Sequence, residues 1–488
     1  MAFYTEYISF SRTGDNMKHL NHSLNHVELK DKNLEKSIQT QVKELKKKGI
    51  EFVKYQFTDM QGNIREVTLT VEQIRGIGTT SVDGSSVFGK IIPPTESDML
   101  LMPDFSTLIP IPWSKDTARV ICNVFYPPEK EDKEMIPFEG CGRSILSSAE
   151  RSMNHVLKKR LAQIFPGAKI GKLHAHFAPE IEFLLINGDY DQTKIHLDQN
   201  LENNHYFVPP QKKTDDVMKE ITRGLGLMGL KKEKFHTEVS TFQFEIGIGH
   251  GNVLQIADAT MTIKYIIENV AQTHGLKASF IPKFNRKVNG SGMHVHQNLA
   301  ATVEGKEVNL FFDASSEDGL SHTGRNYFAG LLTYASEITA ITNPLPISYK
   351  RLVPGREAPT YISWDWLNRT ALCRGHSKGI RKVRVEYRSP DPKCNPYLAF
   401  AAMLSAGLAG IEEDLELPPC DNRNFYTDHT GVKELPGNLG EALEIMVRSA
   451  MLRKRMGNFI IDTLYELGRD LWREYCQEVS DIDIRHYF

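Results

Sequence analysis

Several short, otherwise apolar segments of this chain carry charged or imidazole side chains two residues apart. The side chains concerned are Glu180 and Glu182, His294 and His296, and Arg384, Glu386 and Arg388. In a β-strand, side chains i and i+2 point to the same face of the sheet, while the residue between them points to the other face. Glu238 and Glu245 lie between these segments in the sequence. The pattern predicts that several strands present their charged side chains to one polar site.

The first candidate group consists of carboxylates with one imidazole: Glu180, Glu182, Glu238, Glu245, Glu386 and His294. Carboxylates held close together raise each other's pKa unless cations neutralise them. Oxygen ligands with a single imidazole suit Mg²⁺ or Mn²⁺ better than Zn²⁺, which prefers Cys and His. For any one of these glutamates, a place on an exposed sheet edge is the ordinary alternative. Taken together, their apolar neighbours favour a site for two or more divalent cations.

The second candidate group consists of arginines: Arg351, Arg369, Arg374, Arg384 and Arg388. The guanidinium group matches carboxylate and phosphate oxygens with two parallel hydrogen bonds. Beside a two-cation cluster, these arginines indicate an anionic substrate and phosphoryl transfer. Structural ion pairing with the glutamates is an equally ordinary explanation for any single arginine. The sequence contains no GxxxxGK[ST] loop and no kinase GxGxxG, so a nucleotide would have to be held in another way.

Two further features near these groups concern strand geometry. His174 and His176 continue the alternation of Glu180 and Glu182 backwards, but the step from His174 to Glu182 spans about 26 Å at the rise of a strand. We therefore expect the two histidines to be structural or to support the site from outside. Glu238 and Glu245 are separated by an odd number of residues, so one straight strand cannot present both to the same cation. This spacing predicts a bend or bulge near residues 240–241.

The composition describes an ordinary globular protein. The chain has 488 residues, a hydrophobic fraction of 40%, a charged fraction of 25% and a formal net charge of −2. A charge so near zero gives no electrostatic reason to expect nucleic acid or an acidic membrane surface as a partner. The six cysteines are scattered without a CxxC pair, which favours reduced thiols. With no signal peptide and no apolar run of membrane-spanning length, we expect a soluble, cytoplasmic protein.

The chain is expected to have an α+β architecture in three parts: a polar N-terminal extension at 1–33, a smaller domain at 34–128 and a larger domain at 129–488. A hairpin is expected at 52–70, because two alternating runs flank the turn-forming sequence TDMQGN. We expect residues 186–215 to form an exposed loop and the last 60 residues to be helical. Helices are further predicted at about 34–48 (capped by Asn33), 143–164, 214–229, 257–275, 323–341 and 396–411.

Five long motifs resemble, in order, those of type I glutamine synthetases. They are VDGSSVFGKIIPPTESDMLLMPD, APEIEFLL, KASFIPKFNRKVNGSGMHVHQNL, NPLPISYKRLVPGREAPTYISWDWLNRTALCR and RVEYRSPDPKCNPYLAFAAMLSAGLAGI. The resemblance runs from about residue 49 to the end of the chain. It implies an N-terminal β-grasp domain, a catalytic domain with a split antiparallel sheet barrel and helices, and a ring-shaped homo-oligomer, a dodecamer, with active sites shared between neighbouring subunits.

The resemblance also implies roles for individual residues, with ATP, glutamate and ammonium as substrates. The metal ligands would be Glu182, Glu238 and Glu245 for one Mg²⁺ or Mn²⁺ ion, and Glu180, His294 and Glu386 for the second. Glutamate would contact Arg351, Arg388, Asn289 and Gly290, with Arg374 beside the phosphoryl group that Arg369 stabilises. The nucleotide would contact Glu233, His296 and Arg384. The remaining catalytic residues would be Asp83, given by a neighbouring subunit to help deprotonate ammonium, and Glu357, which closes over the intermediate.

The sequence leaves the acceptor amine open. STFQ at 240–243, KFNRKV at 283–288, Arg356, Asn298 and Gly375-His376 depart from the usual family pattern. The spacing of seven between Glu238 and Glu245 also occurs in relatives that ligate larger amines. The leading interpretation is ligation of glutamate and ammonia, because Asp83 offers a carboxylate for ammonium. The alternatives are a γ-glutamyl-amine ligase that uses a polyamine or ethanolamine, and a catalytically silent relative.

Two expectations concern single residues. The tyrosine that some family members adenylylate falls near Tyr426, but the sequence after it differs, so we expect Tyr426 to be an unmodified surface residue. We also expect Glu386 to face a wet cavity, so that Glu386→Ala would abolish turnover without disturbing the fold.

Overall fold

The computed structural model describes residues 32–128, 135–191, 194–195, 198–230, 232–379 and 381–479, without the side chains of Lys90, Lys232 and Glu233. Almost all of the polar extension expected at 1–33 therefore lies outside the described residues. The chain divides into two compact units, Met1–Ser148 and Ala149–Phe488.

The first unit is built on a five-stranded sheet in the order β2-β1-β5-β4-β3. Its strands are β1 (Phe52–Thr58), β2 (Ile64–Thr70), β3 (Thr80–Asp83), β4 (Asp98–Pro110) and β5 (Thr117–Phe125). The predicted hairpin is confirmed, because β1 and β2 pair antiparallel from Phe52–Thr70 to Thr58–Ile64. The Asp59 carboxylate closes the turn by accepting the backbone N–H of Asn63 at 2.9 Å. Strand β1 also pairs with β5 in parallel, which makes the sheet mixed.

Helices of the first unit include α1 (Lys32–Lys47) and α2 (Gly84–Phe88), and α3 (Gly142–Ile164) continues into the second unit. Helix α1 begins one residue before Asn33, so Asn33 lies inside the helix and the predicted cap is wrong. The predicted stop is confirmed: Gly49, at φ 73°, follows the last turn in a left-handed conformation that glycine adopts without strain.

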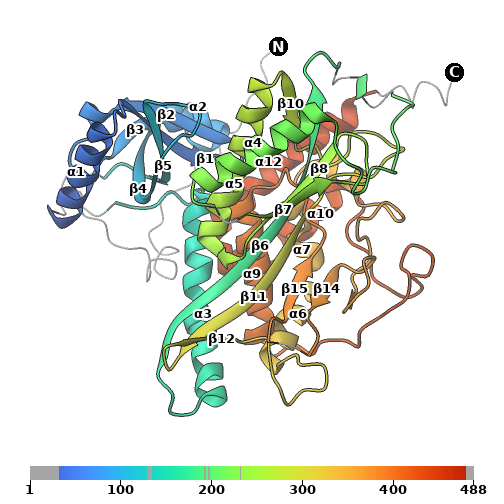
Figure 1. Cartoon of the computed structure of the whole chain (residues 1–488). Helices are drawn as coiled ribbons and strands as arrows, with labels where there is room; N and C mark the ends of the chain where they lie inside the picture. Colours follow the sequence, from blue (N-terminus) through green and yellow to red (C-terminus); the bar gives the residue numbers. More distant parts are fainter. Residues whose placement is uncertain are drawn as a thin grey trace. The chain divides into compact units, whose positions relative to one another are not determined.

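The second unit contains a ten-stranded sheet whose main path runs β13-β14-β15-β11-β6-β8-β7. Its longest strands, β6 (Ile170–Asn187) and β11 (Met293–Val303), pair antiparallel and cross the unit side by side (Figure 1). Shorter strands extend the sheet: β7 (Lys232–Thr237), β8 (Gln243–Ile248), β9 (Gly251–Asn252), β10 (Leu276–Ser279), β12 (Lys306–Asn309), β13 (Trp364–Asp365), β14 (Cys373–His376) and β15 (Arg384–Tyr387).

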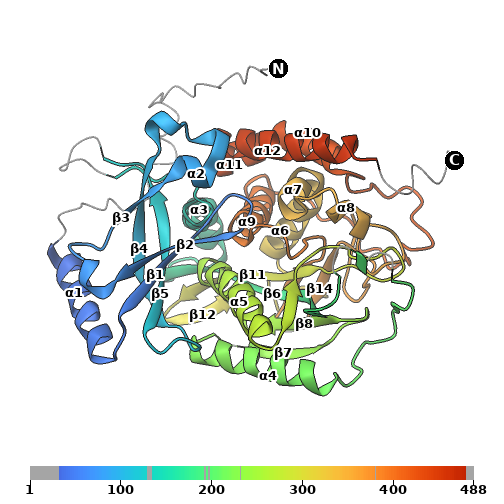
Figure 2. The ribbon, with the colours of Figure 1, turned by 90° about the horizontal axis from the view of Figure 1, so that it is seen from above.

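Helices cover the apolar face of this sheet (Figure 2). Phe177 of β6 packs against Phe400 of α9 with tilted rings whose centroids are 5.3 Å apart, and the ring centroids of Phe183 and Phe280 are 5.9 Å apart. These side chains alternate with the polar ones on β6, so the opposite face of the sheet carries the glutamates and histidines. The helices of the unit are α4 (Lys212–Leu227), α5 (Val253–Thr273), α6 (His322–Thr333), α7 (Ala335–Thr342), α8 (Ser348–Arg351), α9 (Pro396–Glu412), α10 (Leu439–Val447), α11 (Ala450–Met456) and α12 (Asn458–Gln477).

Two expectations about local structure need correction. The helix expected at 323–341 is two helices, α6 and α7, which meet at Tyr334. Residues 186–215 are not simply an exposed loop, because Ile195 and Leu201 are buried against Leu184 and Phe284. This segment covers the end of β6 beyond the polar residues. None of the helices in the described part of the chain is long and apolar enough to cross a membrane.

Candidate active site

Strand register brings the predicted metal ligands together on one face of the sheet. Glu180 of β6 lies opposite His294 of β11, and Glu182 lies opposite Glu245 of β8. On the far side of β11, His296 lies opposite Glu386 of β15. Neighbouring strands are about 4.8 Å apart, so these pairs place the side chains within reach of shared cations.

The first group contains Glu182, Glu238 and Glu245, joined by His236. The His236 Nε2 lies 3.1 Å from a Glu245 oxygen, and its Nδ1 lies 3.7 Å from a Glu238 oxygen. Burial, and then the charges of Glu238 and Glu245, raise the pKa of Glu182. Burial and the charge of Glu245 raise the pKa of Glu238 to about 7. Raised carboxyl pKa values of this kind are typical of a site in which a bound cation would neutralise the carboxylates.

A chain reversal, rather than a bulge within one strand, brings Glu238 and Glu245 together. Strand β7 ends at Thr237 and β8 begins at Gln243, and the two pair as an antiparallel hairpin. In the turn, Phe242 adopts φ 67° and the Glu238 N–H donates to the Gln243 carbonyl at 2.9 Å. The expectation that the chain must bend near residues 240–241 is confirmed, and the register places His236 directly opposite Glu245.

Gln243 holds the Glu182 carboxylate in place. Its amide Nε2 donates to Glu182 Oε2 at 2.8 Å and to the Gly290 carbonyl at 3.0 Å. The backbone N–H of Gly292 donates to the same Glu182 oxygen at 2.9 Å. These bonds engage Oε2 of Glu182, while no hydrogen bond of the described residues engages its Oε1.

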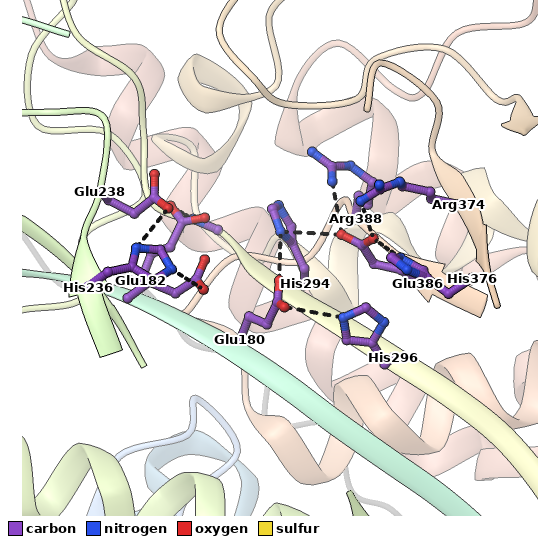
Figure 3. A network of polar contacts seen from close by, with 12 residues as sticks. Glu180, Glu182, His236, Glu238, His294, His296, Arg374, His376, Glu386 and Arg388 are labelled. Atoms are coloured by element: carbon purple, nitrogen blue, oxygen red, sulfur yellow. Dashed lines mark hydrogen bonds and ion pairs between the residues drawn. The ribbon is translucent and has the colours of Figure 1, made fainter. Parts of the chain in front are cut away.

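The second group contains Glu180, His294 and Glu386 (Figure 3). The His294 Nδ1 lies 3.6 Å from an oxygen of Glu180 and 3.6 Å from an oxygen of Glu386. The Nε2 of the same ring is buried without a hydrogen-bond partner among the described residues. The Nδ1 atom, which faces both carboxylates, fits a shared divalent cation, because a cation between them would contact all three groups.

Glu386 is also the partner of several cationic side chains. The Arg388 guanidinium donates to it at 2.9 Å, Arg374 lies 3.5 Å away, and His376 Nε2 lies 2.6 Å away. Burial opposes the charge of Glu386, but these neighbours, Arg388 first, hold its pKa well below the usual range. The residue is only 2% exposed, so the expectation that it faces a wet cavity is wrong.

The predicted nucleotide residues are only partly described. His296 Nε2 lies 3.3 Å from Glu180, and its Nδ1 accepts a hydrogen bond from the Arg384 Nε at 3.4 Å. Both residues therefore adjoin the second metal-ligand group. The backbone of Glu233 lies in β7, and its side chain is outside the described residues.

Among the predicted glutamate-binding residues, Arg351 lies close enough to Glu182 for the two charges to interact. Arg351, at the end of α8, is buried and donates to the backbone carbonyls of Ser389 at 2.6 Å and Arg388 at 3.3 Å. Gly292 leaves room for this side chain, because a Cβ there would lie 2.4 Å from an Arg351 nitrogen. Asn289 is buried, and its carbonyl accepts a hydrogen bond from the Ser240 hydroxyl at 3.2 Å.

Arg369 and Glu357 are exposed near the same groups. Arg369 lies beside the Tyr206 side chain, and the charges of Glu357 and Glu386 act on it and help to raise its pKa. Glu357 adopts φ 58°, an unusual conformation for a residue with a side chain, and its charge also reaches Glu238. The loop from 353 to 360 thus brings a carboxylate toward the first metal-ligand group.

Asp83 belongs to the first unit, where it caps α2. Its carboxylate accepts the backbone N–H of Ser86 at 3.2 Å and the hydroxyls of Ser85 and Ser86 at 2.6 Å each. The hydrogen bond from Ser85, followed by those from Ser86, lowers the pKa of Asp83 to about 2. So weak a base suits binding a cation better than removing its proton.

Sequence reasoning missed three side chains: His236, His376 and Gln243. Arg374 and His376 stand two apart on β14, the same pattern that revealed the other strands, so His376 could have been found. His236 could be found only from the register of the β7–β8 hairpin.

Tyr426 is part-buried rather than a plain surface residue. Burial raises the pKa of its phenol, and the charges of Arg388, Glu357 and Arg351 also act on it.

Comparison with known proteins decides the family. The family description "Glutamine synthetase, beta-Grasp domain" matches residues 49–127, and "Glutamine synthetase, catalytic domain" matches residues 151–487. The chain belongs to the glutamine synthetase family. Its fold class is therefore the one predicted: an α+β protein with an N-terminal β-grasp domain and a larger catalytic domain, in which helices flank a nearly closed sheet barrel.

Similar proteins cover nearly the whole chain. Glutamine synthetases from Methanocaldococcus jannaschii, Thermotoga maritima and Thermus thermophilus are 36%, 34% and 35% identical to it. They cover 93%, 92% and 91% of this chain, which in turn covers 98%, 99% and 97% of theirs. Membership of this family makes the protein a carbon–nitrogen ligase of nitrogen metabolism that acts on small molecules; its relatives use ATP and divalent metal ions.

Solved structures show the same fold. A structure named "GmaS/ADP complex-Conformation 1" has a TM-score of 0.77 at 26% identity, and "Apo GmaS without ligand" has a TM-score of 0.75 at 27% identity. Each comparison covers 91% of this chain and 98% of the solved chain.

Proposed function

We propose that the protein converts L-glutamate and ammonia into L-glutamine with cleavage of ATP to ADP and phosphate, through a γ-glutamyl phosphate intermediate. The observation that carries this proposal is the juxtaposition, on one sheet face, of two carboxylate-rich groups with buried arginines. The Nε atoms of Arg374 and Arg388 are buried without hydrogen-bond partners among the described residues, which suits an incoming anion. Divalent cations, when bound, neutralise phosphate charge and polarise the transferring group.

The two groups divide the metal ligands. Glu182, Glu238 and Glu245 hold one cation, with His236 beside them, and Glu180, His294 and Glu386 hold the second. The oxygen-rich composition favours Mg²⁺ or Mn²⁺.

The remaining site residues are proposed on the resemblance of their motifs to those of the family. The nucleotide contacts Glu233, His296 and Arg384; the solved relative whose name includes ADP supports a nucleotide in this family's fold. Arg351, Arg388, Asn289 and Gly290 bind glutamate. Arg374 and Arg369 stabilise the phosphoryl group as the glutamate γ-carboxylate attacks it, and Glu357 closes over the product of that step.

Gly290→Ala should raise the KM for glutamate at least tenfold with less effect on the KM for ATP. A Cβ at this position would lie 2.2 Å from the Pro282 carbonyl oxygen and 2.8 Å from Cγ of Arg351, so the backbone and the alkyl chain of Arg351 must both move. Gly305→Ala, where a Cβ meets nothing within 4 Å, is the matched control for the extra methyl group. Because Gly305 has φ 77° and Gly290 has no positive φ, the control also carries a backbone strain that Gly290→Ala lacks, which makes it a strict one. If the two variants had equal KM values for glutamate, the assignment of Gly290 to the glutamate-binding site would be wrong.

Ammonium is the proposed acceptor, bound by Asp83 and Glu357. An assay of phosphate release from ATP and glutamate, with ammonium compared against methylamine, ethanolamine and putrescine at equal concentrations, tests this choice. Faster turnover with ammonium supports glutamine formation. Faster turnover with one of the larger amines would replace it by a γ-glutamyl-amine ligase of the same family, the alternative left open by Arg356 and the KFNRKV segment.

Assembly follows from the position of Asp83. We propose a cytoplasmic, ring-shaped homo-oligomer, a dodecamer, in which Asp83 of one subunit completes the site of its neighbour. Oligomers reassembled from Asp83→Ala and Arg369→Ala subunits should then recover activity that neither variant has alone, because some shared sites contain both native residues. If activity is recovered at no mixing ratio although both variants assemble into oligomers, Asp83 does not complete a neighbour's site. Asp83 and Arg369 would then act in the site of one subunit, or Asp83 would have no part in the active site.

A further inference from the structure

A third group of potential ligands lies on the same sheet face, away from the proposed active site. His174 and His176 of β6 and Glu307 of β12 each offer one nitrogen or oxygen, and these atoms all lie within 4.8 Å of one another. The group is formed within the second unit alone. Nothing in the proposed glutamine-forming reaction uses it.

Strand register explains why these three residues meet. His176 lies opposite Asn298 of β11, and His174 lies opposite Ala300. The β11–β12 hairpin then folds back, with Glu307 opposite Thr302. Even-numbered residues of β6 and β11 share one face, and Glu307 joins this face through its pairing with Thr302.

The His176 ring lacks the partners that a buried imidazole normally has. Both of its ring nitrogens are buried without a hydrogen-bond partner among the described residues. Its Nε2 lies 3.4 Å from a Glu307 oxygen, without hydrogen-bond geometry. Two ligands bonded to one metal ion at about 2.1 Å in a tetrahedron lie about 3.4 Å apart, so this spacing already matches shared coordination.

Neighbouring rings fix the orientation of His176. The His174 ring stacks on it with centroids 5.5 Å apart and an interplanar angle of 12°, and the His250 ring packs edge-on at 5.7 Å. The Glu307 side chain is 55% exposed, so an ion can enter from solvent.

We propose that His174, His176 and Glu307 bind a transition-metal cation of the Zn²⁺ type, with a water molecule in the fourth position. Two imidazoles and one carboxylate suit Zn²⁺, in contrast to the oxygen-rich groups that favour Mg²⁺ or Mn²⁺. Four residues separate His176 from Glu180, about 13 Å along the strand, so the ion is distinct from those of the active site. It ties the β11–β12 hairpin to β6.

Zinc content tests this proposal. The full-length protein is stripped with a chelator, saturated with Mg²⁺, dialysed against Zn²⁺, and its bound zinc is measured by elemental analysis. Wild type and the control His322→Gln, an exposed histidine paired with Asp414, should hold about one more zinc per chain than His176→Gln or Glu307→Gln. Since Mg²⁺ and Zn²⁺ compete equally at the active site in all four proteins, the difference reports the new site. Equal zinc content in all four would overturn the proposal.

The location of the ion gives a second, independent readout. Anomalous scattering at the zinc edge from crystals of the wild-type protein should show a peak among His174, His176 and Glu307. Zinc peaks confined to the Glu182 and Glu386 groups would overturn the proposal even if the Gln variants lost zinc through disturbed folding.

Discussion

Replacing Glu386 by Gln should lower kcat by about 10²- to 10³-fold, because the amide keeps the shape of the side chain but withdraws one negative charge from a proposed cation site. The Gln side chain can still accept a hydrogen bond from Arg388, which lies 2.9 Å from Glu386. The fold should therefore persist, and the concentration of Mg²⁺ or Mn²⁺ needed for half-maximal activity should rise. Steady-state kinetics across a metal titration measures both quantities.

Glu386→Ala should behave differently from Glu386→Gln. Both variants remove the negative charge that is paired with Arg388, Arg374 and His376, and leaving buried positive charge unpaired costs about 3–5 kcal/mol of stability in comparable cases. Only the Ala variant also loses the hydrogen-bond acceptor and the volume of the side chain, so it should unfold at a clearly lower temperature than the Gln variant, which itself unfolds below wild type. Glu317→Gln, the same chemical change at an exposed glutamate outside both proposed sites, is the control and should keep wild-type turnover. Full activity of Glu386→Gln at low metal concentration would contradict the assignment of Glu386 as a ligand.

Arg369→Ala should lower kcat by about 10³-fold, the lower end of the range for an arginine that stabilises a transferring phosphoryl group. Arg369 is exposed and lies beside Tyr206, so its truncation removes no buried packing. Its removal should therefore leave the unfolding temperature almost unchanged. Binding of ATP, measured by calorimetry, should weaken much less than kcat falls, because the interaction strengthens only in the transition state.

A comparison with Tyr206→Phe separates catalysis from positioning. This variant keeps Arg369 but removes the hydroxyl group that orients it, so kcat should fall by a smaller factor than in Arg369→Ala. Equal losses of kcat and of ATP affinity in Arg369→Ala would show that the arginine merely binds the nucleotide.

The sheet face of the site was predictable because its signal is local. Strand periodicity of two is written in adjacent residues, so the sequence alone assigns Glu180 with Glu182 and His294 with His296 to one face. The hairpin at 52–70 was predictable for a similar reason, since its turn residues lie between two alternating runs. The turn between Glu238 and Glu245 was constrained by the odd spacing alone.

Features that depend on packing between distant parts of the chain could not be predicted from the sequence. His236 meets Glu245 only because β7 and β8 pair in one register, and no local pattern fixes that register. The burial of Ile195 and Leu201 depends on contact with Phe284, far along the chain. The depth of Glu386 was misjudged because a polar site does not have to be wet: surrounding arginines and histidines replace water as its partners.

His174 and His176 show how a correct pattern can be given too narrow a meaning. Their alternation with Glu180 and Glu182 placed them on the same face, and their distance along the strand separated them from the active site. The sequence could not reveal Glu307 as a third member, because its position depends on where the β11–β12 hairpin folds back.

Transfer of ¹⁸O from glutamate tests the central claim most directly. The protein is given ATP, ammonium and glutamate labelled with ¹⁸O in the γ-carboxylate, and the released phosphate is examined by mass spectrometry. If the carboxylate attacks the γ-phosphorus of ATP and the nitrogen then displaces phosphate from the acyl carbon, each phosphate must carry one ¹⁸O atom from glutamate. Glutamine formed with unlabelled phosphate would contradict a γ-glutamyl phosphate intermediate.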